Sequence, residues 1–110
     1  MRITAVILAY NEERHLERCL ASLQDLTTQV VVVDCFSTDQ TVEIARRHHA
    51  RVIQHVWVNH ASQFNWALTQ LDADTEWVLR IDADEMLTSA LVAEIKSRLL
   101  NIGAEIDGVY

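Results

Sequence analysis

The sequence has no proline and only two glycines, Gly103 and Gly108. The loops before residue 103 must therefore turn without the two residues that most often shape turns, and we expect Asn, Asp, Ser and Thr to replace them. A dinucleotide-binding domain is the lowest-ranked interpretation, because such domains carry a glycine-rich turn after the first strand.

Cysteine is also scarce. Cys19 and Cys35 are too few and too irregularly spaced for a disulfide framework or a zinc knuckle. The five histidines do not suggest a metal site either. His48 and His49 are adjacent in an expected helix and point about 100° apart, so they cannot easily share one ion. We expect surface or packing roles for all five.

The chain also lacks a basic block and a long apolar run. Nine basic and sixteen acidic residues give a formal charge of −7, which makes nucleic acid an unexpected partner and suits the binding of a cation. Charged residues follow the short apolar run at 3–9 directly, which argues against a signal peptide or a spanning helix. We expect a cytoplasmic protein.

Apolar residues occur in two alternating patterns. Continuous runs typical of buried strands lie at residues 3–9, 29–34, 50–57 and 76–81, and 107–110 resembles the start of another. Helical stripes lie within residues 11–23, 42–49, 61–71 and 88–100. We expect Asn11 to be the N-cap of the first helix and Thr88 or Ser89 that of the last. In the last helix the residues expected to face inward are Leu91, Val92, Ile95 and Leu99. This alternation predicts an α/β fold, with a mostly parallel sheet between helices in three layers and a single domain over residues 1–110.

Polar residues follow each expected strand. The segments are YNEE (10–13), DCFSTD (34–39), VNHASQ (58–63) and DADE (82–85). Because parallel strands end at one edge of a sheet, and ligands of such sheets bind outside that edge, these segments should share one site.

The segment DADE carries the most specific chemical signal. In an extended backbone Asp82 and Asp84 point the same way, and two neighbouring carboxylates are tolerable when a divalent cation lies between them. Carboxylates and phosphate oxygens are usual ligands of Mg²⁺ or Mn²⁺. The alternative is that both acids lie in a surface loop without binding a ligand, while Glu85 favours the start of a nearby helix. The position after a buried strand, among other acids, favours the metal.

Three segments in register carry a family resemblance: VILAYNEERHLERCLASL, VVVVDCFSTDQTVEIARRHHARVI and WVLRIDADEML. Together they resemble the amino-terminal half of glycosyltransferase family 2, which has the Rossmann-like GT-A fold. The most similar members are bacterial enzymes that add sugars to lipopolysaccharide core or related surface glycans. The chain departs from the family pattern at Phe36 and Gln40, where glycine is common.

The resemblance implies a set of site residues. Those implied to bind the nucleotide are Ala9, Tyr10, Asn11, Glu12, Asp34, Asn65 and Asp82, and those implied to bind the metal are Asp84 and Asp82. Gln63 lies in the same helix as Asn65 and ranks below it. Ser37 and Asp39 are expected to shape their loop rather than to touch ligand.

The resemblance also implies a reaction. A nucleoside diphosphate sugar, most readily a uridine one, would donate its sugar to a glycan or glycolipid acceptor with inversion, with Mg²⁺ or Mn²⁺ as cofactor. Family members are roughly twice this length, so the acceptor portion and the catalytic base are expected beyond Tyr110 and no catalytic residue is assigned here. Weaker expectations are peripheral contact of residues 45–51 with the inner membrane face, and self-association through an unpaired sheet edge.

Two other classes remain open. The chain can be a non-catalytic nucleotide-binding module or an inactive fragment that turns nothing over. A metal-dependent phosphatase ranks lower, because that fold places its nucleophilic aspartate after the first strand, where this chain has Tyr10, Asn11 and Glu12.

Overall fold

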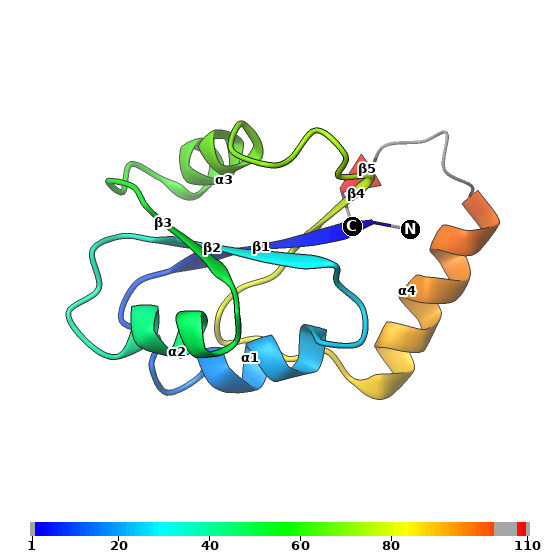
Figure 1. The fold of residues 1–110 in the computed structure, drawn as a ribbon, viewed down its shortest axis with the longest axis horizontal. Coiled ribbons are helices and arrows are strands. Elements are labelled where there is room, and N and C mark those ends of the chain that lie inside the picture. The colour runs from blue at the N-terminus through cyan, green and yellow to red at the C-terminus, as the bar shows by residue number, and fades with distance from the viewer. Residues whose placement is uncertain (1, 103–107, 110) are drawn as a thin grey trace.

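The computed structural model describes residues 2–102 and 108–109, and Figure 1 shows the fold. The elements in chain order are β1 (Ile3–Ala9), α1 (Leu16–Leu23), β2 (Gln29–Asp34), α2 (Thr41–Arg47), β3 (Arg51–Gln54), α3 (His60–Leu68), β4 (Trp77–Arg80), α4 (Ser89–Ile102) and β5 (Gly108–Val109). The strands pair in the order β3-β2-β1-β4-β5, and every pair is parallel. The predicted α/β class and the parallel sheet are confirmed.

Helices cover both faces of the sheet, with α1 and α2 on one face and α3 on the other (Figure 1). The alternation of side chains along β1 explains these layers, because successive residues of a strand point to opposite faces. Ile3, Ala5 and Ile7 belong to the apolar cluster that includes α1. Val6 and Leu8 belong to the cluster that includes α3.

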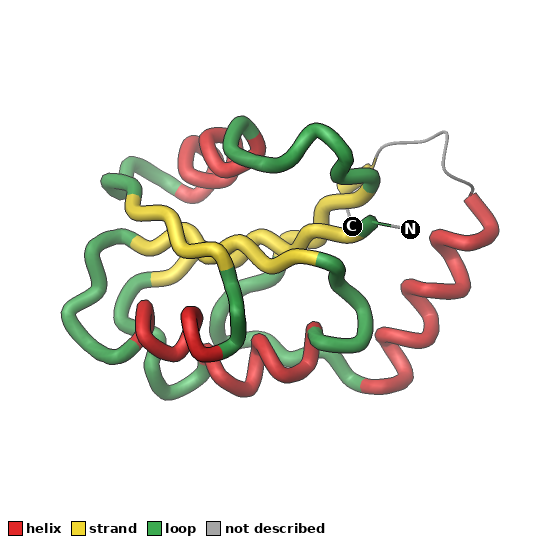
Figure 2. The backbone as a smooth tube through the Cα atoms, in the orientation of Figure 1, coloured by secondary structure: helices red, strands yellow, loops and turns green. Residues whose placement is uncertain are grey.

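The strand register brings the strand ends together. Ala9 of β1 pairs with Asp34 of β2, which pairs with Gln54 of β3. On the other side of β1, Val6 pairs with Arg80 at the end of β4. The strands therefore run in one direction and their carboxyl ends share one side of the sheet, which we call the carboxyl edge (Figure 1). Figure 2 shows in green the loops that join these strands to the helices.

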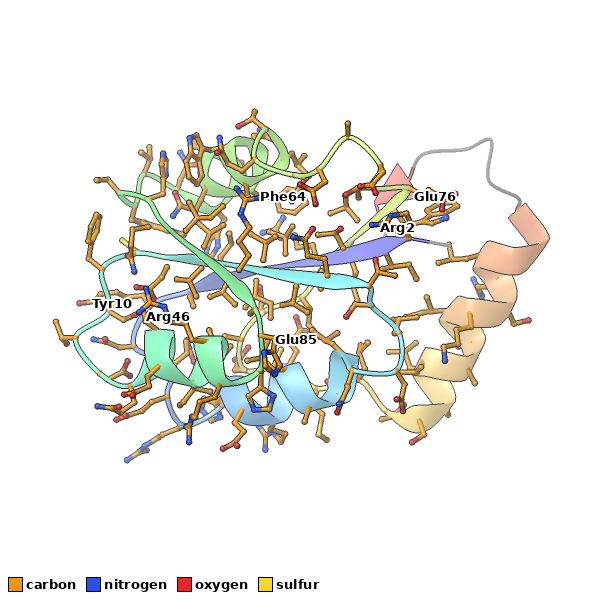
Figure 3. The ribbon with its side chains drawn as sticks, viewed as in Figure 1. Arg2, Tyr10, Arg46, Phe64, Glu76 and Glu85 are labelled. Atoms are coloured by element: carbon orange, nitrogen blue, oxygen red, sulfur yellow. The ribbon has the colours of Figure 1, made fainter. Side chains whose placement is uncertain are left out.

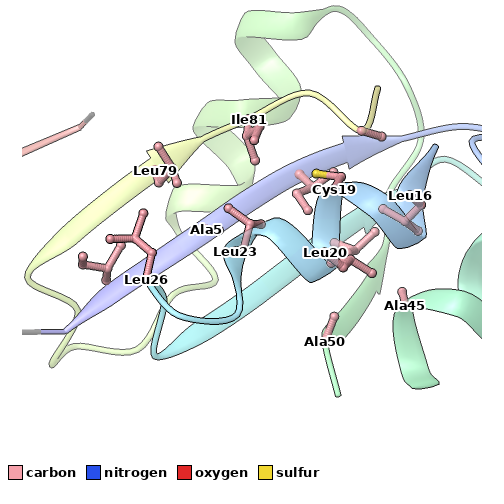
Figure 4. Packing of buried hydrophobic residues seen from close by; sticks show 14 of the residues in the cluster. Ala5, Leu16, Cys19, Leu20, Leu23, Leu26, Ala45, Ala50, Leu79 and Ile81 are labelled. Atoms are coloured by element: carbon pink, nitrogen blue, oxygen red, sulfur yellow. The ribbon is translucent and has the colours of Figure 1, made fainter. Parts of the chain in front are cut away.

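Helix α1 has the predicted apolar stripe but a later start. Leu16, Cys19, Leu20 and Leu23 are all buried, and they pack on the sheet (Figure 4). Burial of one such leucine contributes about 1.5–3 kcal/mol. The expected N-cap at Asn11 is wrong: this residue has a left-handed backbone with φ of 50°. The backbone N–H groups of His15 and Leu16 instead bond the carbonyl of Glu12.

The last elements agree with the prediction in part. Thr88 caps α4 by accepting a hydrogen bond from the backbone N–H of Leu91, and Ile95 is buried as expected. Leu91 was predicted to face inward, but it is exposed. The strand expected at residues 107–110 is present as β5, which pairs with β4, whereas residues 107 and 110 lie outside the described residues. Among the described residues no helix is long and apolar enough to cross a membrane.

Candidate functional site

A pocket of about 510 Å³ opens at the carboxyl edge. Its lining comes from the ends of β1 and β2 and from the start of α3: Leu8, Ala9, Tyr10, Glu12, Val33, Cys35, Trp57, His60 and Gln63. Figure 3 shows Tyr10 at this end of the molecule, with Arg2 and Glu76 at the other end. The volume lies within the usual range for small-molecule sites.

The loops after β1 and β2 are joined by hydrogen bonds between side chains and backbone. The side-chain Oδ1 of Asn11 accepts from the backbone N–H of Thr38 at 2.8 Å, and the Asn11 backbone N–H donates to the Ser37 hydroxyl at 2.9 Å. Ser37 in turn donates, from its backbone N–H and its hydroxyl, to the carboxylate of Asp34. Asp34 is fully buried, and these donors fix the orientation of its side chain.

A second set of hydrogen bonds joins the same loops at Glu12 and Glu13 on one side and at Asp39 and Thr41 on the other. The buried Thr41 hydroxyl accepts from the backbone N–H of Glu12 at 2.8 Å and donates to Asp39. Desolvation opposes ionisation of Asp39 most strongly, but the bonds from Thr41 and from the Glu13 backbone outweigh it and lower the pKa of this carboxyl. Ser37 and Asp39 thus bond within the loops, as expected for residues that shape them.

Phe36 lies between these bonded residues and has a strained backbone. Its φ is 54°, in the left-handed region that favours glycine or asparagine. A hydrogen bond of 2.9 Å from its backbone N–H to the Gln54 side chain holds this conformation. The side chain is 57% exposed. Glycine would adopt this backbone without the strain that a Cβ causes.

The acids after β4 lie in a turn rather than in an extended segment. Strand β4 ends at Arg80, and the backbone N–H of Glu85 bonds the carbonyl of Asp82 at 2.9 Å. The extended backbone assumed for Asp82 and Asp84 is thus wrong, because the chain reverses there. Both aspartates are still exposed on either side of the buried Ala83. The Glu85 carboxylate accepts from the Asp82 backbone N–H, a role that the sequence did not indicate.

The three acids of this turn produce a local negative potential above α1. The Cys19 thiol donates to the carbonyl of Asp82 at 3.7 Å. Burial first, and then the negative charges of the three acids, raise the pKa of Cys19 from 9.0 to about 12. The described residues contain no ready-made group of three metal ligands. Two exposed carboxylates nevertheless fit a cation that takes its remaining ligands from phosphate oxygens and water.

Helix α3 turns Gln63 toward the pocket and Asn65 away from it. Gln63 is 1% exposed and lines the pocket, whereas Asn65 is exposed and does not. The pocket therefore includes Gln63 but not Asn65, although the resemblance ranks Asn65 first. The expected packing role holds for His55, which stacks on Trp66 with 3.8 Å between ring centroids. Its ring Nδ1 also lies 2.7 Å from the Gln63 oxygen, a contact that no sequence pattern indicates.

A parallel sheet with a pocket outside the carboxyl ends of its strands defines a ligand-binding α/β domain, of which nucleotide-binding domains are the common type. The model of the family described as glycosyl transferase family 2 matches residues 4–108. This chain belongs to that family.

Relatives in bacteria agree with this assignment. The chain is 40% identical over 95 residues to an uncharacterized glycosyltransferase of Rickettsia typhi, an alignment that covers 86% of this chain and 32% of the relative. It is 34% identical over 111 residues to the lipopolysaccharide core biosynthesis glycosyltransferase LpsC of Rhizobium meliloti, covering 96% and 40%. The chain thus spans about a third of the length of the first of these relatives.

Solved structures give the same fold. Glucosyl-3-phosphoglycerate synthase of Mycobacterium tuberculosis, in complex with Mn²⁺, uridine diphosphate and phosphoglyceric acid, matches with a TM-score of 0.67 and 26% identity. The match covers 77% of this chain and 34% of that one. A complex of the same enzyme with Mg²⁺ and uridine diphosphate gives the same TM-score and identity. The predicted GT-A fold and the predicted family are confirmed.

Proposed function

We propose that this chain binds the nucleoside diphosphate sugar donor of an inverting glycosyltransferase, with the acceptor site and the catalytic base supplied by other parts of a longer protein. The observation that carries the proposal is the placement of the pocket and the acidic turn at one edge of the sheet. The pocket adjoins the ends of β1 and β2, and the turn follows β4, which pairs with β1 on its other side.

The pocket is suited to the nucleoside. Leu8, Val33 and Trp57 offer apolar surface for a base, and Tyr10 and Glu12 offer polar atoms for a ribose. Asp34 ends the strand beside the pocket and stays proposed as a base contact. Its carboxylate accepts two bonds from Ser37 and can accept more, since a carboxylate has about four acceptor positions. Asn11 is proposed to act by holding the loop of this site, and Asn65 has no proposed contact.

The acidic turn is suited to the diphosphate. Asp84, with Asp82, would hold Mg²⁺ or Mn²⁺, the ions present beside uridine diphosphate in the mycobacterial complexes. When bound, such an ion supplies positive charge that stabilises a departing phosphate. The carboxylates also keep any anion away until a cation is present, because the exposed acids of the turn repel it.

The acceptor is proposed to be a glycan or glycolipid, since LpsC is named for lipopolysaccharide core biosynthesis. A bacterial origin and a cytoplasmic location, with contact at the inner membrane face, are part of this proposal. The basic residues of α2, Arg46 and Arg47, would make that contact. A binding module without turnover is the second candidate, because the chain spans about a third of its first relative.

Thermal unfolding with uridine diphosphate, with and without Mn²⁺, tests the donor proposal. Ligand at a hundred times Kd should add about 2.7 kcal/mol, which raises Tm by roughly ten degrees in a domain of this size. The gain should need Mn²⁺ and should fall in Asp84→Asn and Asp82→Asn. Asp25→Asn is the matched control, because Asp25 is an exposed acid between α1 and β2, at the opposite edge.

Two results would overturn the proposal. One is the absence of stabilisation by uridine diphosphate under both conditions. The other is an equal response to Mn²⁺ in the native chain and in both variants of the acidic turn. Hydrolysis of the donor sugar by this chain alone would contradict the separate expectation that the base lies in another part of the protein.

A further inference from the structure

Gln63 is the buried polar side chain of the pocket whose orientation is fixed from both ends. Its oxygen lies 2.7 Å from Nδ1 of His55, and its Nε2 donates to the backbone carbonyl of His55 at 3.3 Å. Gln63 is 1% exposed and lines the pocket. One residue of the loop after β3 therefore sets both ends of an amide that α3 carries.

The two contacts admit one orientation of the amide. A backbone carbonyl only accepts, so the nitrogen end of Gln63 must face it. The oxygen end then faces His55 Nδ1, and this nitrogen must carry a proton because the amide oxygen cannot donate. A flipped amide would bring two oxygens together at the carbonyl. It would keep a contact with Nδ1 only if His55 were in the other neutral form.

The ring of His55 is itself held in place. It stacks on Trp66 of α3, with 3.8 Å between the centroids and 20° between the planes. The backbone N–H of His55 donates to the carbonyl of Asp34 at 3.0 Å. The imidazole thus joins the end of β2 to α3 and cannot turn away from Gln63 without losing the stack.

Gln63 keeps hydrogen-bonding capacity for a ligand. An amide has two N–H donors and two acceptor positions on its oxygen, and the contacts with His55 use one of each. One donor and one acceptor position remain, in a fixed order. The pairing edges of the two pyrimidines carry the opposite order: uracil has an N3–H donor beside the O4 acceptor, and cytosine has an N3 acceptor beside the N4 amino donor. A fixed amide can therefore distinguish them, whereas a freely flipping amide cannot.

We propose that Gln63 contacts the base of the donor and that His55 is a positioning residue, which fixes the Gln63 amide so that the pocket selects uracil over cytosine. The inference rests on the proposed function, since it names the base that the proposed donor site reads. It adds His55, which was expected to have a surface or packing role, and gives a specific role to Gln63, which was already a lower-ranked candidate.

Binding of uridine diphosphate and cytidine diphosphate in the presence of Mn²⁺ tests this inference. The diphosphate and the metal are common to both ligands, so the ratio of the two Kd values reports on the base alone. We expect the native chain to bind uridine diphosphate about tenfold more tightly, the cost of one misplaced hydrogen bond. In His55→Phe a ring remains to stack on Trp66 but the Nδ1 donor is lost, and the ratio should fall to about threefold or less.

Two further variants separate positioning from packing. In His55→Asn the side-chain amide nitrogen can replace Nδ1 as a donor, so this variant should recover most of the selectivity that His55→Phe loses. Gln63→Glu removes the N–H donor and should also lower the ratio. His49→Asn is the control for the exchange, because His49 follows α2 at the opposite edge and has a φ of 62° that asparagine tolerates.

The outcomes distinguish the two proposals. If the native chain binds neither nucleotide, the proposed function fails and the inference fails with it. If it binds uridine diphosphate, the inference alone is overturned by equal affinity for the two ligands, by a preference for cytosine, or by a ratio that is unchanged in His55→Phe. If Gln63→Glu does not fold, the comparison of His55→Phe with His55→Asn still tests the inference, because both variants keep Gln63.

Discussion

The two halves of the carboxyl edge are built differently. The loops after β1 and β2 are joined by a continuous set of hydrogen bonds from Asn11, Ser37 and Thr41, and Asp34 is buried beneath them. The turn after β4 has exposed acids, and among its described bonds are one from the Asp82 backbone to Glu85 and one from Cys19. The loops after β1 and β2 are therefore shaped before a ligand arrives, whereas the turn after β4 presents exposed acidic side chains.

The difference suggests that the two parts of the proposed site recognise different parts of the donor. A base and ribose are recognised by shape and direction, and a preformed pocket lowers the ordering cost of binding. A metal diphosphate is recognised mainly by charge, and exposed carboxylates can supply the charge that attracts the metal. The first half should thus respond to substitution through stability, and the second through ligand and proton binding.

The largest effect is expected from Asp34→Ala. This change leaves the N–H and the hydroxyl of Ser37 without their acceptor in a partly buried setting. We expect a loss of about 2–3 kcal/mol and a fall in Tm of roughly 10–20 °C, measured by urea and thermal unfolding. Asp84→Asn is the control at an exposed aspartate. Its free energy of unfolding should stay within about 0.5 kcal/mol of the native value. Equal losses in the two variants would remove the distinction between the halves.

A smaller effect concerns the proton on Cys19. Its pKa is raised from 9.0 to about 12 in the folded chain, so the folded state binds more protons than the unfolded state between these values. Stability that is fully present below pH 9 should therefore fall as pH rises toward 12, by about 2 kcal/mol at about pH 10.5. The measurement is the free energy of unfolding against pH.

Cys19→Ala provides the comparison for that slope. The variant loses some packing at every pH, but this part of its pH dependence should disappear. Tyrosine and lysine titrations are common to both proteins and cancel in the difference. Parallel curves for the native chain and Cys19→Ala would show that the acids of the turn, together with burial, do not hold the thiol protonated.

The sequence predicted the arrangement of the edge better than its local geometry. Strand β2 was expected at residues 29–34 and lies there, because a run of four valines has few alternatives. The turn at Asp82–Glu85 and the left-handed Asn11 were missed, since each depends on hydrogen bonds that form only after the strands are paired. The contact of His55 with Gln63 joins a loop to a helix and leaves no periodic signal.

Asp34 has a role in the structure and a separate predicted role in binding. The resemblance implies that it contacts the base, and aspartate is also a residue type that shapes turns. The structure shows the turn bonds from Ser37. Because Asp34 is fully buried and does not line the pocket, contact with a base would require its carboxylate to become exposed on binding. The role in binding stays a prediction, which the stability of Asp34→Ala alone does not test.

The smallest expected effect is at Phe36, in the loop after β2. It tests whether the backbone strain of this residue lowers the stability of the folded chain. Its left-handed φ of 54° costs a residue with a side chain about 1 kcal/mol, and the exposed ring gains little from packing. In Phe36→Gly this cost is removed, but glycine loses about 0.5–1 kcal/mol more backbone entropy on folding. We therefore expect a net gain of a few tenths of a kcal/mol, measured as a shift of the urea midpoint at constant m.

Phe36→Ala separates the backbone from the ring in this prediction. Alanine keeps the Cβ and therefore the strain, so it should show no gain. A loss of more than about 1 kcal/mol in both variants would mean that the ring packs on its neighbours. A gain with glycine alone, accompanied by weaker binding of uridine diphosphate, would mean that the strain serves to hold an aromatic side chain beside the pocket, as expected for strained residues at functional sites.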